Sequence, residues 1–422
     1  MTSNGELNNK RYLKAITKDI TNFKDLQYYG TLYIGSMRHK MTFIYDTGSS
    51  WVWLPTSLCE TCPTDNLYDI NKVIDLPNIN SSNPSEVLPD TQVEILVYGT
   101  GEVGGIRITE DVFLYKRGKE VVKDFVMLGI VIANGIDGDV ADGILGLGPT
   151  QPDQGRGNFV TSLKTNDLIE YEMFSFDFKL QGEKSKMIFG DIDKSIVKNP
   201  HNIVWVPMNG EEDYWTLPLK GIYFGKQQVK IGEFAVIDTG SSTMALSENN
   251  FLSLMQAVLD TGLECGFFIE EKFVACICPN GSEDFPILTL NINGHNFGME
   301  PEDYIASEDD VCVILVYNLG DRAVVSDDTV VLGVNFLRKF YTVFDMEKER
   351  IGIYENQTDL LKSGFTTWQI TIFLIMFLIL NVLILSYVQY KRKAKSERGT
   401  KSNAVNNKPT MHNMQNEINI KI

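Results

Sequence analysis

The chain has 422 residues, of which 43% are hydrophobic and 11% aromatic, and its formal net charge is −17. This composition is typical of a folded protein and excludes a disordered or fibrous one, and the length favours two domain-sized lobes. The charge is unevenly divided, because the residues after Val388 carry +6 and the rest of the chain therefore carries −23. A body so acidic repels the phosphate backbone, which excludes nucleic acid as a partner.

The chain begins with a polar N-terminal segment, residues 1–24, in which no signal peptide can be read. From residue 28 on, short runs rich in Val, Ile, Tyr, Phe and Thr are separated by Gly, Asn, Asp and Pro, which is the pattern of strands and turns. We therefore expect an all-β architecture with short accessory helices and a polar surface loop at 65–90. The predicted strands cover 28–35, 41–45, 93–98, 104–108, 121–132, 174–179, 187–190, 203–208 and 220–224, and the predicted helices cover 159–166, 249–261 and 335–340.

One five-residue motif occurs twice in the chain. Asp46-Thr47-Gly48-Ser49-Ser50 is repeated letter for letter as Asp238-Thr239-Gly240-Ser241-Ser242, and each copy follows an apolar run. A single Asp-Thr-Gly is weak evidence, because Asp and Gly are ordinary turn residues. An identical repeat in matching contexts instead predicts two carboxylates that work together as acid and base.

The repeat extends beyond these two turns. Gly146, at the end of the apolar run 143–146, follows Asp46 by 100 residues, and Gly333 follows Asp238 by 95. The shared order of strand, turn and distant apolar strand indicates a duplicated pair of lobes with a boundary near residues 189–198. We expect an N-terminal β lobe over 25–193 and a C-terminal β lobe over 194–362.

A long apolar run follows the second lobe. No charged side chain occurs from Ser363 to Tyr390, and Ile370–Val388 is close to the length of a membrane-spanning helix. A buried core helix is the alternative, but this segment lacks a polar face. We therefore predict a transmembrane helix over 363–390. The basic residues of 391–422 place that tail in the cytosol, so the body would be lumenal or extracellular, in an endomembrane or lysosome-like compartment or at the cell surface.

Six cysteines support an oxidising compartment, since an even number suits disulfides. The four histidines are dispersed, and no second Cys-x-x-Cys motif follows Cys59 and Cys62, so we expect no metal site. Asn-x-Ser/Thr triplets at Asn80, Asn280 and Asn356 are compatible with glycosylation but also arise by chance. The disulfide candidates are Cys59, Cys62, Cys265, Cys276, Cys278 and Cys312.

Residues 12–356 carry further motifs in a recognisable order. The chain resembles the pepsin-like aspartic endopeptidases, which have two β lobes with a cleft between them. The motifs that carry this resemblance are Tyr29-Gly30-Thr31, Tyr45–Ser50 with Trp53, Tyr98-Gly99-Thr100-Gly101, Ala141–Leu147, Trp205-Val206-Pro207, Tyr214-Trp215, Ile237–Ser242, Leu332-Gly333 and Phe340–Asp345.

The resemblance implies that Asp46 and Asp238 are the catalytic pair of a monomeric endopeptidase without cofactor or metal. One aspartate would take a proton from water while the other donates one to the scissile carbonyl of an extended protein or peptide substrate. The supporting residues would be Thr47, Thr239, Gly48, Gly240, Ser49 and Ser241 around the carboxylates, and Tyr98, Gly99 and Thr100 on a flap that meets Trp53. Tyr98 as a plain hairpin aromatic and Trp53 as simple core are the alternatives.

The chain also departs from the family pattern. Val334 follows Leu332-Gly333 where relatives carry an aspartate, which favours an activity optimum less acidic than that of pepsin, within an acidic to mildly acidic range. The inhibitory propeptide usual in the family is at most a remnant in residues 1–24. The resemblance implies the disulfides Cys59–Cys62 and Cys278–Cys312, which leaves Cys265 to pair with Cys276.

Two other functions compete with an active lumenal protease. A catalytically dead homologue could bind peptides as a receptor, but both Asp-Thr-Gly turns and Tyr98 are intact. A tail-anchored protein with its body in the cytosol would explain the missing signal peptide. The basic cluster after the apolar run and the six cysteines oppose that topology.

Overall fold

The computed structural model describes residues 14–70, 93–99, 101–136, 139–150, 158–209, 213–268, 272–320 and 326–355. Contacts divide the chain into two compact units, residues 1–356 and 357–422. All the described residues belong to the first unit, so the fold below is the fold of that unit.

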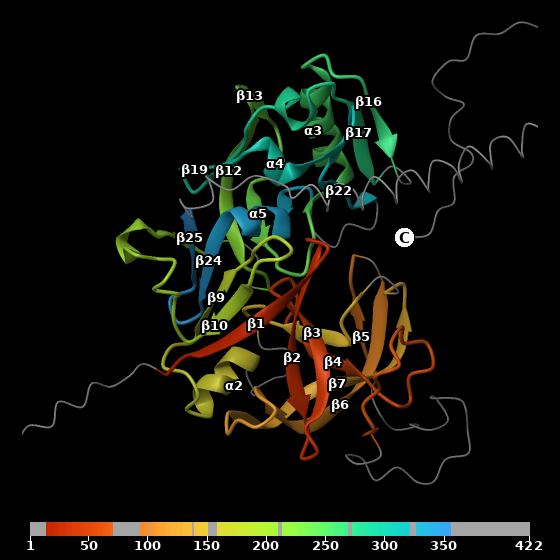
Figure 1. Cartoon of the computed structure of the whole chain (residues 1–422), viewed down its shortest axis with the longest axis vertical. Coiled ribbons are helices and arrows are strands. Elements are labelled where there is room, and N and C mark those ends of the chain that lie inside the picture. The colour runs from red at the N-terminus through yellow and green to blue at the C-terminus, as the bar shows by residue number, and fades with distance from the viewer. Residues whose placement is uncertain are drawn as a thin grey trace, which may run out of the picture. The chain divides into compact units, whose positions relative to one another are not determined.

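The described residues form three β-sheets, as Figure 1 shows. The largest runs in the order β11-β25-β24-β9-β10-β1-β2-β3-β8-β4-β7-β6-β5. Its strands are β1 (Ile16–Phe23), β2 (Gln27–Ile34), β3 (His39–Asp46), β4 (Val52–Pro55), β5 (Glu94–Val97), β6 (Glu102–Phe113), β7 (Val121–Asn134), β8 (Gly143–Gly146), β9 (Met173–Asp177), β10 (Ser185–Phe189), β11 (Val204–Pro207), β24 (Phe340–Asp345) and β25 (Arg350–Glu355).

The other two sheets belong to the second half of the chain. One has the order β19-β18-β12-β14-β23-β15-β22 with β13 paired to β12, and the other has the order β16-β17-β21-β20. Their strands are β12 (Thr216–Phe224), β13 (Gln227–Val229), β14 (Phe234–Ile237), β15 (Met244–Leu246), β16 (Cys265–Phe268), β17 (Phe273–Ile277), β18 (Leu288–Ile292), β19 (His295–Met299), β20 (Ile305–Glu308), β21 (Val311–Ile314), β22 (Val316–Asn318) and β23 (Thr329–Leu332).

Helices are short, as the sequence predicts. The described α-helices are α2 (Phe159–Thr165), α3 (Glu248–Leu259), α4 (Pro301–Tyr304) and α5 (Val334–Lys339), and the 3₁₀ helices are η2 (Pro200–Asn202) and η3 (Gly281–Asp284). The predicted helices correspond to α2, α3 and α5, and each predicted strand overlaps an observed one. Along β2, buried and half-buried residues alternate with period two, the signature of a strand with one face on a core. The mostly β architecture is thereby confirmed.

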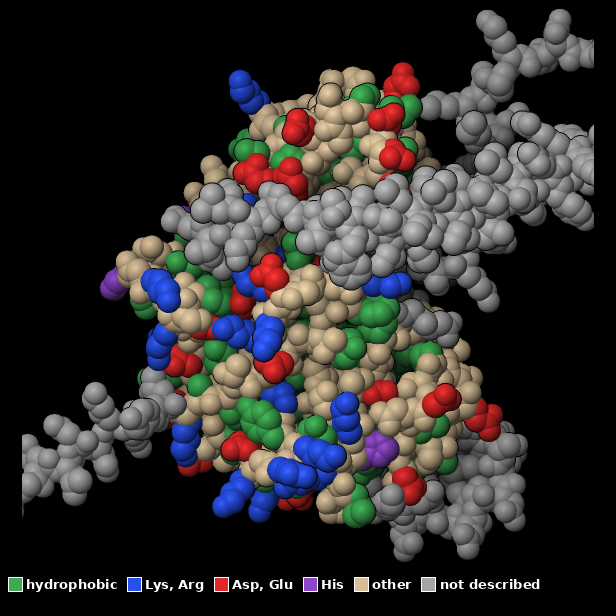
Figure 2. Space-filling view, viewed as in Figure 1, with side chains coloured by type: hydrophobic (Ala, Val, Ile, Leu, Met, Phe, Trp, Pro, Cys, Tyr) green, Lys and Arg blue, Asp and Glu red, His purple; other side chains and the backbone are tan. Residues whose placement is uncertain are grey.

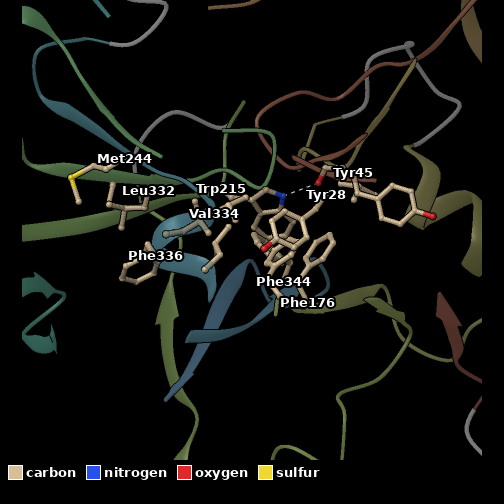
Figure 3. Close-up of a cluster of buried hydrophobic side chains, with 14 of the residues drawn as sticks. Tyr28, Tyr45, Phe176, Trp215, Met244, Leu332, Val334, Phe336 and Phe344 are labelled. Atoms are coloured by element: carbon tan, nitrogen blue, oxygen red, sulfur yellow. Dashed lines mark hydrogen bonds between the residues drawn. The ribbon is translucent and has the colours of Figure 1, made fainter. Parts of the chain in front are cut away.

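Strands from both halves of the chain meet in one sheet. β24 pairs antiparallel with β9, and their rings Phe344 and Phe174 stack with centroids 4.8 Å apart. Trp215, fully buried beside them, donates a hydrogen bond from Nε1 to the Leu147 carbonyl oxygen at 2.8 Å (Figure 3). Aromatic rings of this size dominate core energetics, and the bond satisfies the indole donor. The apolar core is therefore continuous between the two halves, beneath the turns that carry the repeated motif.

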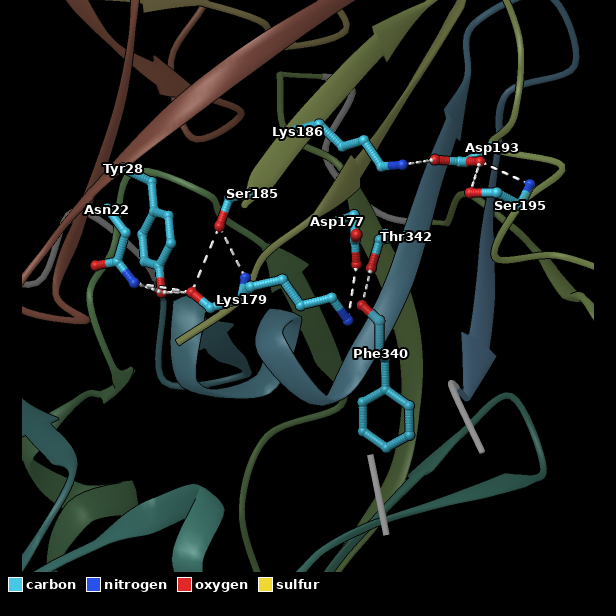
Figure 4. Close-up of polar contacts among 10 residues, drawn as sticks. All are labelled: Asn22, Tyr28, Asp177, Lys179, Ser185, Lys186, Asp193, Ser195, Phe340 and Thr342. Atoms are coloured by element: carbon cyan, nitrogen blue, oxygen red, sulfur yellow. Dashed lines mark hydrogen bonds and ion pairs between the residues drawn. The ribbon is translucent and has the colours of Figure 1, made fainter. Parts of the chain in front are cut away.

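β1 lies inside the polar N-terminal segment, residues 1–24, and is a full member of the largest sheet. It pairs with β10 on one side and β2 on the other. The Asn22 side chain donates to the Lys179 carbonyl oxygen at 2.8 Å, and the Tyr28 hydroxyl donates to the same oxygen at 2.9 Å (Figure 4). Ion pairs Lys179–Asp177 and Lys186–Asp193 continue this polar cluster. At least residues 16–23 are thus built into the folded unit.

Several predicted features lie outside the described residues. They are the predicted transmembrane helix with Ile370–Val388, the basic tail 391–422, residues 71–90 of the predicted surface loop, and the sites Asn80 and Asn356. In the part of the chain that the structure describes, no helix is long and apolar enough to cross a membrane.

Candidate active site

The two aspartates of the repeat stand at equivalent places in the fold. Asp46 ends β3, which lies parallel to β8, and Asp238 directly follows β14, which lies parallel to β23. The backbone N–H of Leu147 donates to the Asp46 carbonyl oxygen at 2.7 Å, and the N–H of Asp238 donates to the Leu332 carbonyl oxygen at 3.0 Å. Each aspartate is thus fixed through its main chain by the distant apolar strand of its own half.

Glycines at the end of these bracing strands leave room for the active-site turns. A Cβ on Gly146 would lie 2.4 Å from the Trp51 carbonyl oxygen. On Gly333 it would lie 2.3 Å from the Thr243 carbonyl oxygen. Both neighbours are backbone atoms that cannot move aside, so any side chain here would displace the turn.

The two threonines of the motif bind the halves together. The Thr47 hydroxyl donates to the Ile237 carbonyl oxygen at 2.8 Å and accepts from the Thr239 N–H at 2.9 Å. In return, the Thr239 hydroxyl donates to the Tyr45 carbonyl oxygen at 2.5 Å and accepts from the Thr47 N–H at 3.0 Å. Both threonines are buried, at 0% and 2% exposure, so these bonds are sheltered from water.

Each carboxylate accepts hydrogen bonds from its own turn. Asp46 accepts from the Gly48 N–H at 2.8 Å and from the Ser49 hydroxyl. Asp238 accepts from the Gly240 N–H at 2.8 Å and from the Ser241 hydroxyl at 2.6 Å.

The glycines also bring each carboxylate against the opposite turn. A Cβ on Gly48 would lie 2.6 Å from the Asp238 carboxylate, and one on Gly240 would lie 2.3 Å from Asp46 Oδ1. The two carboxylates therefore face each other, with Asp46 buried and Asp238 half-buried.

A hairpin of β5 and β6, the flap, carries Tyr98 near this pair. The Tyr98 hydroxyl accepts a hydrogen bond from Trp53 Nε1 at 2.8 Å, and the flap turn closes with the Tyr98 N–H donating to the Gly101 carbonyl oxygen at 2.7 Å. Gly99 lies at the exposed tip, and Thr100 falls outside the described residues. The flap tyrosine is thus tied to β4, the strand that follows the first active-site turn.

The family model of the eukaryotic aspartyl proteases matches residues 27–356. The chain belongs to this family. It is 26% identical to pepsin A of Gallus gallus over 352 residues, which cover 79% of this chain and 85% of that protein. It is 28% identical to pepsin A of Bos taurus over 79% of this chain and 85% of the relative. It is also 28% identical to plasmepsin IV of Plasmodium falciparum over 79% of this chain and 70% of the relative. The protein is accordingly an aspartic endopeptidase, a hydrolase of peptide bonds.

Burial and the facing carboxylate set the protonation of the protease's aspartate pair. Burial, and secondly the charge of Asp238, raise the pKa of Asp46 well above its usual range, while the Ser49 and Gly48 hydrogen bonds oppose the rise. The pair therefore keeps one proton to a higher pH than a free carboxyl would. Burial also raises the pKa of the Tyr98 hydroxyl, with the charge of Asp46 as the second cause, so Tyr98 stays neutral.

The flap of the protease has a small core of its own, separate from the main one. Trp51, Trp53 and Ile144 are buried there, and Tyr98 packs against them. At the flap base, the Arg107 guanidinium lies 5.3 Å from the centre of the Trp51 ring and donates to Glu94 at 2.8 Å. Sequence reasoning did not find Trp51, Glu94 or Arg107, because their contacts depend on a strand register that no motif reveals.

Three disulfides join the six cysteines, Cys59–Cys62, Cys265–Cys276 and Cys278–Cys312, the pairs expected from the sequence. Cys265 and Cys276 stand opposite each other on β16 and β17, and Cys276 is in turn opposite Cys312 on β21. Two of the three disulfides, Cys265–Cys276 and Cys278–Cys312, thus cross-link neighbouring parts of the four-stranded sheet. Among the described residues, no three His, Cys, Asp or Glu side chains are grouped so as to hold a metal ion.

Replacing the Thr47 hydroxyl should lower both the stability of the fold and the activity. In Thr47→Val, the Ile237 carbonyl and the Thr239 N–H lose their partner, at a cost of about 1–3 kcal/mol in the free energy of unfolding. The same loss loosens the two aspartates, so kcat/KM should fall at least about tenfold. Urea unfolding and peptide cleavage measure the two effects.

Thr56→Val is the matched control, because Thr56 is also fully buried and its hydroxyl donates to the Ile130 carbonyl oxygen at 2.8 Å within a single half. It should lose similar stability and keep its kcat. Equal losses of kcat in the two variants would contradict the role of Thr47 in alignment.

Asp46→Asn should stabilise the fold at neutral pH. Because the folded pKa of Asp46 lies above the unfolded value of about 3.9, the stability that this group contributes is complete below that value and is lost as the pH rises through the raised pKa. The amide never ionises, so the variant should melt about 2 °C or more above the wild type near pH 7 and at a similar temperature near pH 3. A lower Tm than the wild type at neutral pH would show that burial of the charge is not what raises the pKa.

Proposed function

We propose that Asp46 and Asp238 are the catalytic pair of this protease. The observation that carries the proposal is the approach of each carboxylate to the glycine of the opposite turn, which leaves one proton to be shared between two acids. The ionised aspartate takes a proton from a water molecule as its oxygen attacks the scissile carbonyl carbon. The protonated aspartate gives its proton to the carbonyl oxygen, and a neutral tetrahedral intermediate forms without a covalent enzyme adduct.

The surrounding residues hold the two carboxylates in position. Thr47 and Thr239 fix the two turns, Ser49 and Ser241 bond the outer carboxylate oxygens, and Gly48 and Gly240 let the backbone approach. Hydrogen bonds to the ionised form favour it, so the serines oppose the effect of burial. The contacts given above and family membership support these roles.

The substrate is a protein or peptide held extended between the lobes, 25–193 and 194–362, under the flap residues Tyr98, Gly99 and Thr100. An extended peptide gains main-chain hydrogen bonds in such a cleft, and pockets on either side select its side chains. The Tyr98–Trp53 bond supports this role of the flap, because it sets the depth to which the hairpin reaches. The catalytic unit acts as a monomer.

The protease works at acidic to mildly acidic pH in a lumenal or extracellular setting. Three disulfides suit an oxidising compartment. Val334, which follows Gly333, is buried. Because a valine stands there in place of the aspartate of the family pattern, the sequence predicts a pH optimum of activity less acidic than that of pepsin. The raised pKa of Asp46 supports that direction, since the shared proton is lost at a higher pH.

Cleavage of a quenched peptide library between about pH 3 and 7 tests the catalytic pair. Asp46→Asn and Asp238→Asn should each lower kcat/KM at least about a thousandfold, and the wild-type profile should peak above about pH 3. Wild-type activity no higher than that of the two variants would identify a catalytically dead peptide-binding homologue instead.

We also propose that the apolar run Ile370–Val388 anchors the protease to a membrane, with the tail 391–422 in the cytosol. Its length and lack of charge support this. The full-length chain should stay in the membrane pellet after alkaline carbonate extraction. Its exposed Asn280 should carry a glycosidase-sensitive glycan in cells that glycosylate Asn-x-Ser/Thr sites. Release into the supernatant would overturn the anchor.

A further inference from the structure

In the four-stranded sheet β16-β17-β21-β20, the strands β16, β17 and β21 carry apolar side chains on both faces. Its inner face is buried in the main core through Val274, Cys276, Cys312 and Ile314. Successive strand residues point to opposite faces, and the registers bring their neighbours together on the outer side. There Phe268 is paired with Phe273, and Ile277 with Val311.

The outer face is exposed to solvent. Phe268 is 47% exposed, Ile277 52% and Val311 42%. Between these larger side chains runs a row of small ones, Gly266, Ala275 and Val313, opposite one another on adjacent strands.

A hollow of about 520 Å³ opens over this face. Leu259 and Leu263, at and after the end of α3, form its other wall. Leu259 is itself 45% exposed, and so is Leu252, two helical turns earlier on the same side of α3. Phe267 lies opposite Val274 and so points to the inner side, where its ring stacks on Phe251 of α3 with the centroids 6.5 Å apart.

An exposed apolar face of this kind indicates a contact with a partner. An antiparallel sheet with one face on a core usually presents polar side chains on the other. Contiguous exposed apolar surface of this kind marks a protein or membrane contact.

The charges around the face narrow the choice of partner. Glu264, Asp309 and Asp310 are exposed at its rim. In Figure 2, acidic side chains outnumber basic ones around α3 and β16, whereas Lys and Arg gather toward β2 and β6. An acidic rim repels anionic lipid and nucleic acid, and it tolerates a neutral lipid surface.

The predicted anchor would hold the fold close to a lipid surface. The described fold ends at Glu355, and the apolar run begins at Ile370, with 14 residues between them. Fourteen residues reach at most about 50 Å even when they are fully extended. An anchored fold therefore meets the bilayer at a high effective concentration, and even a weak apolar contact would form.

We propose that the outer face of β16, β17 and β21 rests on zwitterionic lipid of the membrane that holds the anchor. The inference depends on the anchoring proposed above. Phe268, Ile277 and Val311 enter the boundary between headgroups and acyl chains, and the acidic rim stays in the headgroup layer.

Fluorescence quenching by brominated phosphatidylcholine tests the contact in the full-length protein reconstituted in vesicles. All variants carry Trp368→Phe, which removes the tryptophan next to the apolar run. Phe268→Trp places a reporter on the face. Leu180→Trp is the matched control, because Leu180 is also 47% exposed but follows β9 in the largest sheet.

We expect bromolipid quenching at position 268 to be about twofold or more stronger than at position 180, because only the former inserts into the interface. Replacing a third of the lipid by phosphatidylserine should weaken the quenching at 268. Equal quenching at both positions in a chain that resists carbonate extraction would overturn the lipid contact and leave the anchor intact.

Two further outcomes would also overturn the contact. A blue shift at 268 that depends on protein concentration, without bromolipid quenching, would assign the face to a second copy of the chain. A chain that carbonate releases from the vesicles would remove the anchor and the contact together.

Discussion

The reciprocal hydrogen bonds of Thr47 and Thr239 are the constraint on which the active site depends. Each threonine hydroxyl donates to a carbonyl in the opposite half and accepts from an N–H of that half, so four hydrogen bonds satisfy two hydroxyls, two N–H groups and two carbonyls. Buried groups of this kind are costly to leave unpaired. The two halves are therefore held in one relative position at the turns, and that position sets the approach of Asp46 to Asp238.

This arrangement forces two acids together where water is scarce, which is unfavourable for the fold at neutral pH. The opposing free energy comes from the core beneath the turns, where Trp215 and Phe344 pack with centroids 5.0 Å apart and β24 joins the sheet of the first half. The Trp215 bond to Leu147 ties this core to the residue that braces Asp46. The close approach of the two carboxylates, on which activity depends, thus lowers the stability of the fold. Packing of the core several residues away offsets that loss.

The sequence was most informative where a motif and its strand coincide. The identical pentapeptides and the glycines Gly146 and Gly333 were enough to place both turns, their bracing strands and the mostly β class, because each signal is local. The register in which distant strands pair could not be predicted from the sequence. β1 was not predicted, because its charged residues Lys18 and Asp19 interrupt the apolar pattern of a strand. Its partner, β10, lies far along the chain. The Arg107–Glu94–Trp51 contacts and the apolar outer face of the four-stranded sheet were missed for the same reason.

That outer face also bears on how a tethered protease would work. The four-stranded sheet shares no strand with the sheet that carries the flap. The flap packs on its own small core around Trp53 and is tied to it by Tyr98. A lipid contact made through β16, β17 and β21 therefore constrains the second half and leaves the flap hairpin of the first half free to open. Since Thr47 and Thr239 join the halves at the turns, the same contact would orient Asp46 and Asp238, the proposed catalytic pair, without restricting the hairpin that is proposed to cover the substrate.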